Sequence, residues 1–338
     1  MSGPVLVTGG AGFIGSHLVA RLLGQGRAVR VLDDFSTGQR ANLTAAVLGV
    51  DTAQLEVHEG SVADAAAVQR AFVGVRHCVH LAALPSVARS VEKPLDTHHA
   101  CATGTATVLH GAAQARARVV YAGSSSAYGN QPVEQKHEDL REDPLSPYAA
   151  AKFAGELYCR AFARVYGIQV VVTRFFNVFG PRQPADSPYS GVVAAFCRAL
   201  LRGEAPRIDG DGTQARDFTY VEDVVAGVQR CLEAETANCE TVNLAYGRST
   251  SVLELYERLA AIARERLGLA AVPPPRFAPP RPGDVRHSLA DSSRAKARFG
   301  FAPQVGFADG LLRTFDWYHR AFVRSTEGSG PEGRSKQA

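Results

Sequence analysis

Sulfur-containing residues and tryptophan are scarce in this chain of 338 residues, which contains six cysteines, one methionine and one tryptophan. The cysteines lie far apart, and they form neither a CxxC pair nor a zinc-type spacing with histidine. We therefore expect free thiols in a reducing compartment and no bound metal. The formal net charge is only +4, and basic residues do not gather around aromatic ones, so the sequence does not favour a nucleic-acid partner.

Long apolar runs are also missing from the sequence. No stretch is long enough to cross a bilayer, and the first residues lead directly into a predicted strand, without the apolar segment of a secretory signal. These features predict a cytoplasmic protein that does not associate with membranes. With 46% hydrophobic and 21% charged residues, the chain has the composition of a globular protein and the length for one large or two modest domains.

A strand, a glycine-rich turn, a helix and a second strand are predicted at the beginning of the chain. The strands cover 4–8 and 29–32, and the helix covers 16–24. In such a unit the turn binds a pyrophosphate, because small residues let the backbone approach it and because N–H groups at the start of a helix favour negative charge. The turn has the spacing GxxGxxG, with its glycines at Gly9, Gly12 and Gly15.

An acidic pair, Asp33 and Asp34, ends the second strand. A carboxylate at this distance from the glycine turn typically accepts hydrogen bonds from the ribose of a dinucleotide, and it would repel a 2′-phosphate. No arginine follows until Arg40. The complete unit therefore predicts binding of NAD rather than NADP.

Strand and helix patterns continue to alternate after this unit. Their order predicts an α/β fold with a doubly wound parallel sheet of the Rossmann type over 1–180, and a segment near 222–246 that returns to it. Residues 181–322 are predicted mainly to form a smaller, interleaved substrate-binding domain, and residues 323–338 a disordered tail. Further strands are expected over 55–58, 78–83, 119–123, 170–176 and 241–245, and further helices over 63–73, 101–115, 190–202, 222–234, 252–267 and 308–322.

Tyr148 and Lys152 lie four residues apart in a segment that begins like a helix. Ser146 is a plausible N-cap, and Pro147 suits the first turn. Residues at this spacing share one helix face, so both side chains can point into one cleft. A phenol with an ordinary pKa of about 10 needs a nearby positive charge to accept a proton near neutral pH, and the lysine would supply it. The alternative is a half-buried tyrosine and a solvated lysine without a catalytic role.

Three adjacent serines, Ser124 to Ser126, follow the strand predicted over 119–123. They lie at the sheet edge where ligands bind in open α/β folds, opposite the expected position of Tyr148. Serine-rich turns are also common without a function, so both interpretations stay open on chemistry alone.

Four motifs together resemble the extended short-chain dehydrogenases/reductases. They are the run from Thr8 to Gly15, the serines before Tyr128, the pair Tyr148 and Lys152, and the run from Arg174 to Gly180. Within this superfamily the chain is similar to the nucleotide-sugar 4-epimerases. The stretches 83–91, 179–184 and 281–288 look most like bacterial UDP-N-acetylglucosamine 4-epimerases. The resemblance covers nearly the whole chain, from Val5 to about Phe322.

The resemblance implies roles for individual residues. The catalytic residues would be Ser124, which binds the sugar O4, Tyr148, which is the base, and Lys152, which holds the nicotinamide ribose and lowers the tyrosine pKa. The residues that would bind NAD are Gly9, Gly12, Phe13, Ile14, Gly15, Asp33, Asp34, Ser36, Gly38, Ser61, Val62, Leu81, Ala82, Ala83, Tyr148, Lys152 and Phe176. Those that would bind a UDP-sugar are Ser86, Ser124, Ser125, Ser126, Asn177, Arg216, Arg281, Asp284 and Ser288.

Two positions depart from the family pattern. Ser61 replaces an aspartate that usually contacts adenine, and Cys101 replaces an asparagine that often lies three residues before the helix glycine, here Gly104. Both changes affect details of NAD binding rather than the assignment.

The implied reaction is NAD-dependent C4 epimerisation of a UDP-sugar through a transient 4-keto intermediate. Ser125 and Ser126 stand where a 4,6-dehydratase would need an acid and a base, and the glutamate of a decarboxylase is also missing. Ser288 stands where epimerases of non-acetylated sugars carry a tyrosine, so its small side chain favours UDP-GlcNAc and UDP-GalNAc, with UDP-glucose and UDP-galactose as further substrates. UDP-glucuronate 4-epimerase and a non-catalytic NAD-binding protein remain alternatives.

The helix expected over 146–166 carries more apolar residues than one domain needs. Related enzymes use this helix in a four-helix dimer interface, so the resemblance implies a homodimer. It also implies a place in nucleotide-sugar metabolism, such as polysaccharide biosynthesis.

Overall fold

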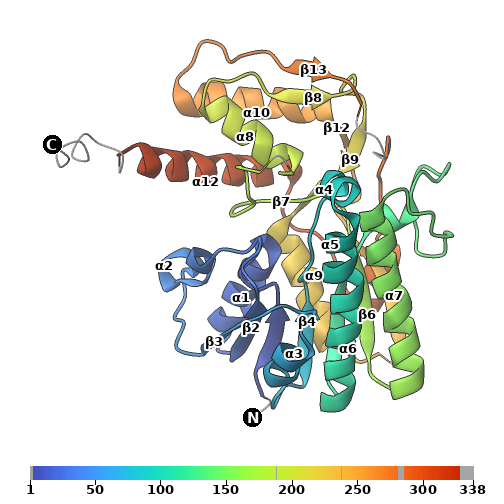
Figure 1. Ribbon diagram of the computed structural model, residues 1–338. Coiled ribbons are helices and arrows are strands. Elements are labelled where there is room, and N and C mark those ends of the chain that lie inside the picture. Colours follow the sequence, from blue (N-terminus) through green and yellow to red (C-terminus); the bar gives the residue numbers. More distant parts are fainter. Residues whose placement is uncertain (1–2, 188, 237, 281–284, 328–338) are drawn as a thin grey trace.

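The computed structural model describes residues 3–187, 189–236, 238–280 and 285–327. Seven parallel strands form its central sheet, in the order β11-β6-β5-β4-β1-β2-β3, which confirms the predicted fold class (Figure 1). Central strands such as β1 and β6 are apolar, β-branched runs buried on both faces, as parallel strands between two helical layers are. The sheet consists of β1 (Val5–Thr8), β2 (Val29–Asp33), β3 (Leu55–Glu59), β4 (His77–His80), β5 (Arg118–Ser124), β6 (Val170–Phe175) and β11 (Cys239–Leu244).

Helices cover both faces of this sheet (Figure 1). On one face, α1 (Phe13–Gly24) packs beside α9 (Val221–Glu233), and both share an apolar core with every second residue of the strands. On the other face, α3 (Ala65–Ala71), α6 (Gly104–Ala115) and α7 (Pro147–Tyr166) enclose a second core. The alternation of side chains along each strand produces these two cores.

The strand that was expected to return to the sheet does so. β11 pairs in parallel with β6, so that Cys239 lies beside Val170 and Leu244 beside Phe175. The chain between these two strands leaves the sheet and contributes to a separate apolar core, whose largest fully buried side chains include Phe179, Phe196 and Phe315.

That separate core is formed by α8 (Val192–Leu201), α10 (Val252–Leu267) and α12 (Phe307–Glu327). Three short strand pairs connect the surrounding loops: β7 (Val178–Phe179) with β10 (Thr219–Tyr220), β8 (Arg207–Asp209) with β13 (Arg276–Ala278), and β9 (Ala215–Asp217) with β12 (Ser249–Ser251). Smaller elements are η1 (Arg40–Leu43), α2 (Ala45–Leu48), α4 (Val87–Glu92), α5 (Pro94–His98), η2 (His99–Thr103), η3 (Ser125–Tyr128) and α11 (Ser293–Phe299).

The sequence prediction differs from the structure in several places. The strand expected over 78–83 ends at His80, because Leu81–Ala83 leave the sheet and line a cavity. The helix expected from residue 101 is preceded by α4, α5 and the π-helical turn η2, which were not predicted. The helix α12 continues to Glu327, because the chain has no glycine or proline between Leu311 and Glu327. The tail expected over 323–338 was therefore predicted to begin too early. Residues 328–338 lie outside the described residues.

No helix among the described residues has the length and apolar character needed to cross a membrane. All six cysteines are free thiols, and five of them are buried. Within the described parts of the chain, no group of three or more histidine, cysteine or acidic side chains is arranged to hold a metal ion.

Candidate active site

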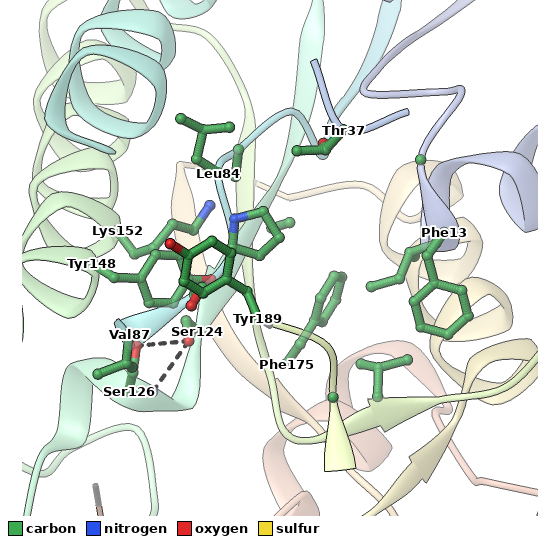
Figure 2. Close-up of a pocket in the computed structure, with 18 of the residues that line it drawn as sticks. Phe13, Thr37, Leu84, Val87, Ser124, Ser126, Tyr148, Lys152, Phe175 and Tyr189 are labelled. Carbon is green, nitrogen blue, oxygen red and sulfur yellow. Dashed lines mark hydrogen bonds between the residues drawn. The ribbon is translucent and has the colours of Figure 1, made fainter. Parts of the chain in front are cut away.

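A cavity of about 1190 Å³ lies at the carboxyl ends of the sheet strands. Its walls include the turns after β1, β2, β4, β5 and β6, together with segments of the smaller core. Figure 2 shows side chains from both ends of the cavity, with Phe13 at one end and Tyr148 at the other. The open α/β fold places a ligand site at this edge, as expected.

The glycine turn forms one end of the cavity. Gly9 has a φ of 70°, which favours glycine, and a Cβ on Gly15 would lie 2.1 Å from the Gly9 carbonyl oxygen. At Gly12, in contrast, a Cβ would contact only that carbonyl oxygen, at 3.2 Å, because its other side faces the cavity. Gly12 is also the N-cap of α1 and brings no capping side chain, so the helix start can accept a phosphate group.

Asp33 lies at the end of β2 and is almost fully buried at the wall of the cavity. Its two carboxylate oxygens accept hydrogen bonds from the N–H groups of Ala11 and Phe35, both at 2.9 Å. Burial raises the pKa of Asp33, while these two hydrogen bonds oppose the shift. Each oxygen keeps a second lone pair that can accept a ribose hydroxyl.

Arg40 is the first basic residue after the acidic pair, and it is engaged elsewhere. It forms an ion pair with Glu59, and its guanidinium lies 4.0 Å from the centre of the Phe35 ring. This geometry leaves a carboxylate, rather than a cation, at the position of the adenosine ribose. The glycine cradle and Asp33 therefore fit NAD, as the sequence predicted.

The three predicted catalytic residues meet at the other end of the cavity. Tyr148 and Lys152 leave α7 on the same face, and Ser124 ends β5 opposite them (Figure 2). Ser146 caps α7 by accepting a hydrogen bond from the Ala149 N–H, at 3.2 Å. The Ser124 hydroxyl forms a 2.8 Å hydrogen bond with the Ser126 hydroxyl, so two of the three serines form one polar group.

The expected lowering of the Tyr148 pKa is not found in this structure. Burial raises the pKa of Tyr148, Cys101 acts in the same direction, and a hydrogen bond with Ser124 opposes both effects. Lys152 is itself buried, which lowers its pKa, and its ammonium lies 4.4 Å from the centre of the Tyr121 ring. Burial is therefore the largest influence on the pKa of Tyr148.

Most of the residues predicted to bind NAD line the cavity. They are Gly9, Gly12, Phe13, Ile14, Gly15, Asp33, Asp34, Ser36, Ser61, Val62, Leu81, Ala82, Ala83, Tyr148, Lys152 and Phe176. Gly38 does not line it: a Cβ at this position would lie 2.9 Å from an Asp33 oxygen, so Gly38 packs behind that carboxylate. Its neighbour Thr37 lines the cavity instead.

Ser61 and Cys101, the two residues that depart from the family pattern, both have clear surroundings in the structure. The Ser61 hydroxyl lines the cavity and accepts a 3.2 Å hydrogen bond from the Ala63 N–H. Cys101 is fully buried in η2, where it packs near Ala102 and Ala151.

The residues predicted to bind the UDP-sugar also gather at the cavity. Ser86, Ser124, Ser125, Ser126, Asn177, Arg216 and Ser288 line it. Arg281 and Asp284 lie outside the described residues. One guanidinium nitrogen of Arg216 donates to the carbonyl oxygens of Ala215 and Arg286, at 2.9 and 3.2 Å.

Several cavity residues were missed by sequence reasoning. Arg89 belongs to α4, which was not predicted, and Lys136 and Tyr189 come from loops without a regular pattern. The Tyr189 hydroxyl donates a 2.6 Å hydrogen bond to Glu92 of α4. For Arg89 the sequence does give a signal, because it lies within the stretch 83–91 that carries the family resemblance, three residues after the predicted Ser86.

Three features meet in one cavity of this parallel sheet: a phosphate-binding glycine turn, an acidic residue after the second strand, and a Ser, Tyr and Lys trio. Together they define a Rossmann-fold enzyme that uses NAD. The family model described as "NAD dependent epimerase/dehydratase family" matches residues 5–245. The chain belongs to this family.

Known proteins of similar sequence and structure agree with this assignment. UDP-glucose 4-epimerase of Mycolicibacterium smegmatis is 37% identical over 316 residues, which cover 93% of this chain and 97% of the relative. The crystal structure of UDP-glucose 4-epimerase from Thermotoga maritima matches with a TM-score of 0.86 and 35% identity, over 94% of this chain and 99% of its own. UDP-N-acetylglucosamine 4-epimerase from Methanobrevibacter ruminantium matches with a TM-score of 0.86 and 34% identity, over 95% and 100%.

Proposed function

We propose that this enzyme epimerises UDP-sugars at C4, with UDP-GlcNAc and UDP-GalNAc as its preferred pair and UDP-glucose and UDP-galactose as further substrates. The observation that carries the proposal is the meeting of Ser124, Tyr148 and Lys152 in the cavity that also contains the NAD-type glycine turn. The likeness to 4-epimerases of UDP-glucose and of UDP-N-acetylglucosamine supports it.

Each catalytic side chain has a distinct task in this reaction. Tyr148 takes the proton from the sugar O4 and later returns it, while Ser124 holds that oxygen by a hydrogen bond. Lys152, on the same face of α7, provides the positive charge that stabilises the tyrosinate. NAD, when bound, supplies a reversible hydride acceptor, so the reaction has no net change in oxidation state.

The sugar must rotate between the two hydride transfers, so that its opposite face meets the cofactor, while the UDP stays in place. Arg216 and Asn177 line the cavity and can hold the diphosphate, since a guanidinium pairs well with phosphate oxygens. The released 4-keto sugar then needs space to present its opposite face. Small residues such as Ser86 and Ser288 at the cavity wall provide this space.

Ser288 carries the proposed preference for acetylated sugars. It lines the cavity and is only 8% exposed, so a larger side chain at this position would occupy cavity volume. We expect Ser288→Tyr to reduce kcat/KM for UDP-GlcNAc by at least about tenfold, with a smaller effect on UDP-glucose, because an acetyl group needs the occupied space. An equal loss on both substrates would contradict the role of Ser288.

UDP-glucuronate 4-epimerase activity is the second candidate, and Arg89 favours it. This arginine lines the cavity, and a guanidinium would pair well with the carboxylate of a uronic acid. This alternative predicts that epimerisation of UDP-glucuronate depends on the positive charge of Arg89. Arg89→Gln removes this charge and should therefore lower that activity.

The deciding experiment incubates the purified protein, without added cofactor, with UDP-GlcNAc and with UDP-glucuronate in separate reactions followed by NMR. We expect UDP-GalNAc to appear, and we expect Tyr148→Phe to lower turnover by about 10² to 10⁴ with folding intact. Formation of UDP-galacturonate alone would support the second candidate. Near-normal turnover by Tyr148→Phe would remove this tyrosine from the mechanism.

The proposed homodimer would use the outer face of α7. This helix exposes apolar side chains, with 72% of Val165 and 56% of Tyr166 accessible, and Leu95 of the adjacent α5 is 80% exposed. Light scattering should therefore report about twice the monomer mass, and Val165→Glu should shift the protein toward a monomer. A wild-type monomer at micromolar concentration would exclude this interface.

A further inference from the structure

Asp217 is a fully buried carboxylate outside the catalytic trio. It ends β9, the strand that also carries Arg216, and it is 0% exposed. Its oxygens accept hydrogen bonds from the N–H groups of Tyr246, Gly247 and Ala290, at distances between 3.0 and 3.2 Å. Among the described residues, the donors that the structure shows for this carboxylate are all main-chain N–H groups.

These donors come from two segments that are far apart in the chain. Tyr246 and Gly247 follow β11, the strand that returns to the main sheet. Ala290 lies two residues after Ser288, on a segment that follows the residues outside the described ranges. Asp217 therefore joins three pieces of backbone: its own strand, the exit of the sheet and the segment of Ser288.

Further main-chain contacts strengthen this junction next to the cavity. The Ser288 N–H donates to the Ala215 carbonyl at 3.1 Å, and the Ala215 N–H donates to the Arg286 carbonyl at 2.9 Å. One guanidinium nitrogen of Arg216 reaches the same Arg286 carbonyl at 3.2 Å. Both cavity-lining side chains, Arg216 and Ser288, are thus attached to backbone that Asp217 holds.

Burial raises the pKa of Asp217 to about 7, and the hydrogen bonds from the main-chain N–H groups oppose this shift. A carboxylate that is taken out of water is unfavourable unless its oxygens are well hydrogen-bonded. The converging N–H groups meet this requirement, so the side chain is suited to hold backbone rather than to exchange protons with a substrate.

We propose that Asp217 is a positioning residue for the nucleotide-sugar subsite, because it fixes the backbone on which Arg216 and Ser288 reach the cavity. This inference rests on the proposed function in so far as the ligand is a UDP-sugar. Asp217 does not line the cavity, so it acts through its two neighbours. Its replacement should weaken binding of UDP and UDP-sugar, with little effect on NAD, because neither Arg216 nor Ser288 is among the residues predicted to bind NAD.

Asp217→Asn tests this role with a nearly isosteric side chain. An amide keeps one acceptor oxygen but turns an NH₂ group toward the other donors. In one orientation of the amide Ala290 loses its acceptor, and in the other Tyr246 keeps only the Thr219 hydroxyl. Gly247 donates to both oxygens and keeps one of them. Asp217→Glu retains the charge and should restore part of the lost binding.

Asp223→Asn is the matched control. Asp223 is also buried, at 5% exposure, and its two oxygens accept main-chain hydrogen bonds from Gln304 and Val305, at 2.8 and 3.0 Å. It lies on α9 and does not line the cavity. Its replacement should lower stability in a similar way without a specific effect on nucleotide binding.

The experiment measures UDP binding by calorimetry, KM and kcat for UDP-GlcNAc, bound NAD and the unfolding midpoint for the wild type and each variant. For Asp217→Asn we expect the Kd for UDP and the KM to rise about tenfold, as when one hydrogen bond to a charged group is lost, with kcat changed less than about twofold. NAD content should stay at the wild-type level. Asp223→Asn should keep the wild-type Kd and KM.

Equal changes in UDP binding for both aspartate variants, or none for either, would overturn the positioning role. If Asp217→Asn does not fold, Asp217→Glu decides: a wild-type Kd for UDP in that variant would overturn the role, since the carboxylate is displaced by one methylene group. UDP binding does not require turnover. If the wild type binds UDP but does not epimerise, and Asp217→Asn binds UDP more weakly, the positioning role stands and epimerisation is refuted. A wild type that does not bind UDP would refute both.

Discussion

Acid should destabilise this protein through a histidine buried beneath the glycine turn. His80 ends β4, is 1% exposed and contacts two threonines: Thr8 at 2.7 Å from Nδ1 and Thr105 at 3.0 Å from Nε2. The Thr105 hydroxyl donates to the Cys101 carbonyl, so it must accept the proton of Nε2. Nδ1 is then the unprotonated nitrogen and accepts from the Thr8 hydroxyl.

A second proton on this ring would lie on Nδ1, next to a Thr8 hydroxyl that donates to this nitrogen when the ring is neutral. Burial, together with the charge of Lys152, lowers the pKa of His80 from 6.5 to about 3. The unfolded chain therefore binds a proton near pH 6.5, while the folded protein does not. The stability contributed by the neutral ring is fully present above pH 6.5, and it is lost as the pH falls from 6.5 toward 3.

The loss of stability follows from the number of pH units below 6.5, the pKa of the histidine in the unfolded chain. Each pH unit below 6.5 lowers the free energy of unfolding by about 1.4 kcal/mol for one such histidine, so the loss at pH 5 is about 2 kcal/mol. His80→Gln removes the ionisable group. At pH 7.5 the variant should be less stable than the wild type by about 1–3 kcal/mol, because it loses well-formed hydrogen bonds. At pH 5 most of this difference should disappear.

Urea unfolding followed by circular dichroism at several pH values measures the effect. Thr105→Val is the matched control, because it removes the partner of Nε2 but leaves His80 buried and neutral. Its stability should be lower than that of the wild type at every pH, with the same dependence on pH. Parallel curves for wild type and His80→Gln between pH 7.5 and 5 would refute the reasoning.

Three further predictions concern the cavity and its supports. Gly15→Ala should reduce bound NAD and thermal stability, because its Cβ would lie 2.1 Å from the Gly9 oxygen. Gly24→Ala is the control for the measurement of bound NAD, because its Cβ would meet only Val50, at 3.5 Å. Glu156→Gln should lower the free energy of unfolding by about 1–3 kcal/mol, because Arg174 would lose its fully buried ion partner but keep Glu142, and an unchanged urea midpoint would contradict this. Tyr128→Phe should cost about 1–3 kcal/mol in the same assay, since its hydroxyl donates a 2.7 Å hydrogen bond to buried Asn243.

The parts of the site that repeat a local pattern could be predicted from the sequence. The glycine turn, Asp33 and the four-residue spacing of Tyr148 and Lys152 each depend on a few neighbouring residues, and all of them line the cavity. The return of β11 could also be predicted, because the strand-like segment 241–245 follows a helix and needs a place in the sheet. Local spacing and the direction of parallel strands are sufficient for these features.

The remaining features depend on contacts between distant segments. Tyr189 reaches the cavity because its loop meets Glu92 of α4, and no local pattern indicates that meeting. Thr37 rather than Gly38 lines the cavity, since Gly38 packs against Asp33. The effect of burial on the pKa of Tyr148 could not be predicted, because spacing shows the nearby lysine but does not show how far burial removes water.

The late position of β11 in the chain has a consequence for synthesis. β6 ends at Phe175, but its partner begins only at Cys239, after α8, β8, β9 and α9 have been made. Until then a growing chain presents β6 as an unpaired sheet edge, which can join other chains. A fragment that stops before Cys239 should therefore aggregate, even though it contains the whole glycine turn and all three catalytic residues.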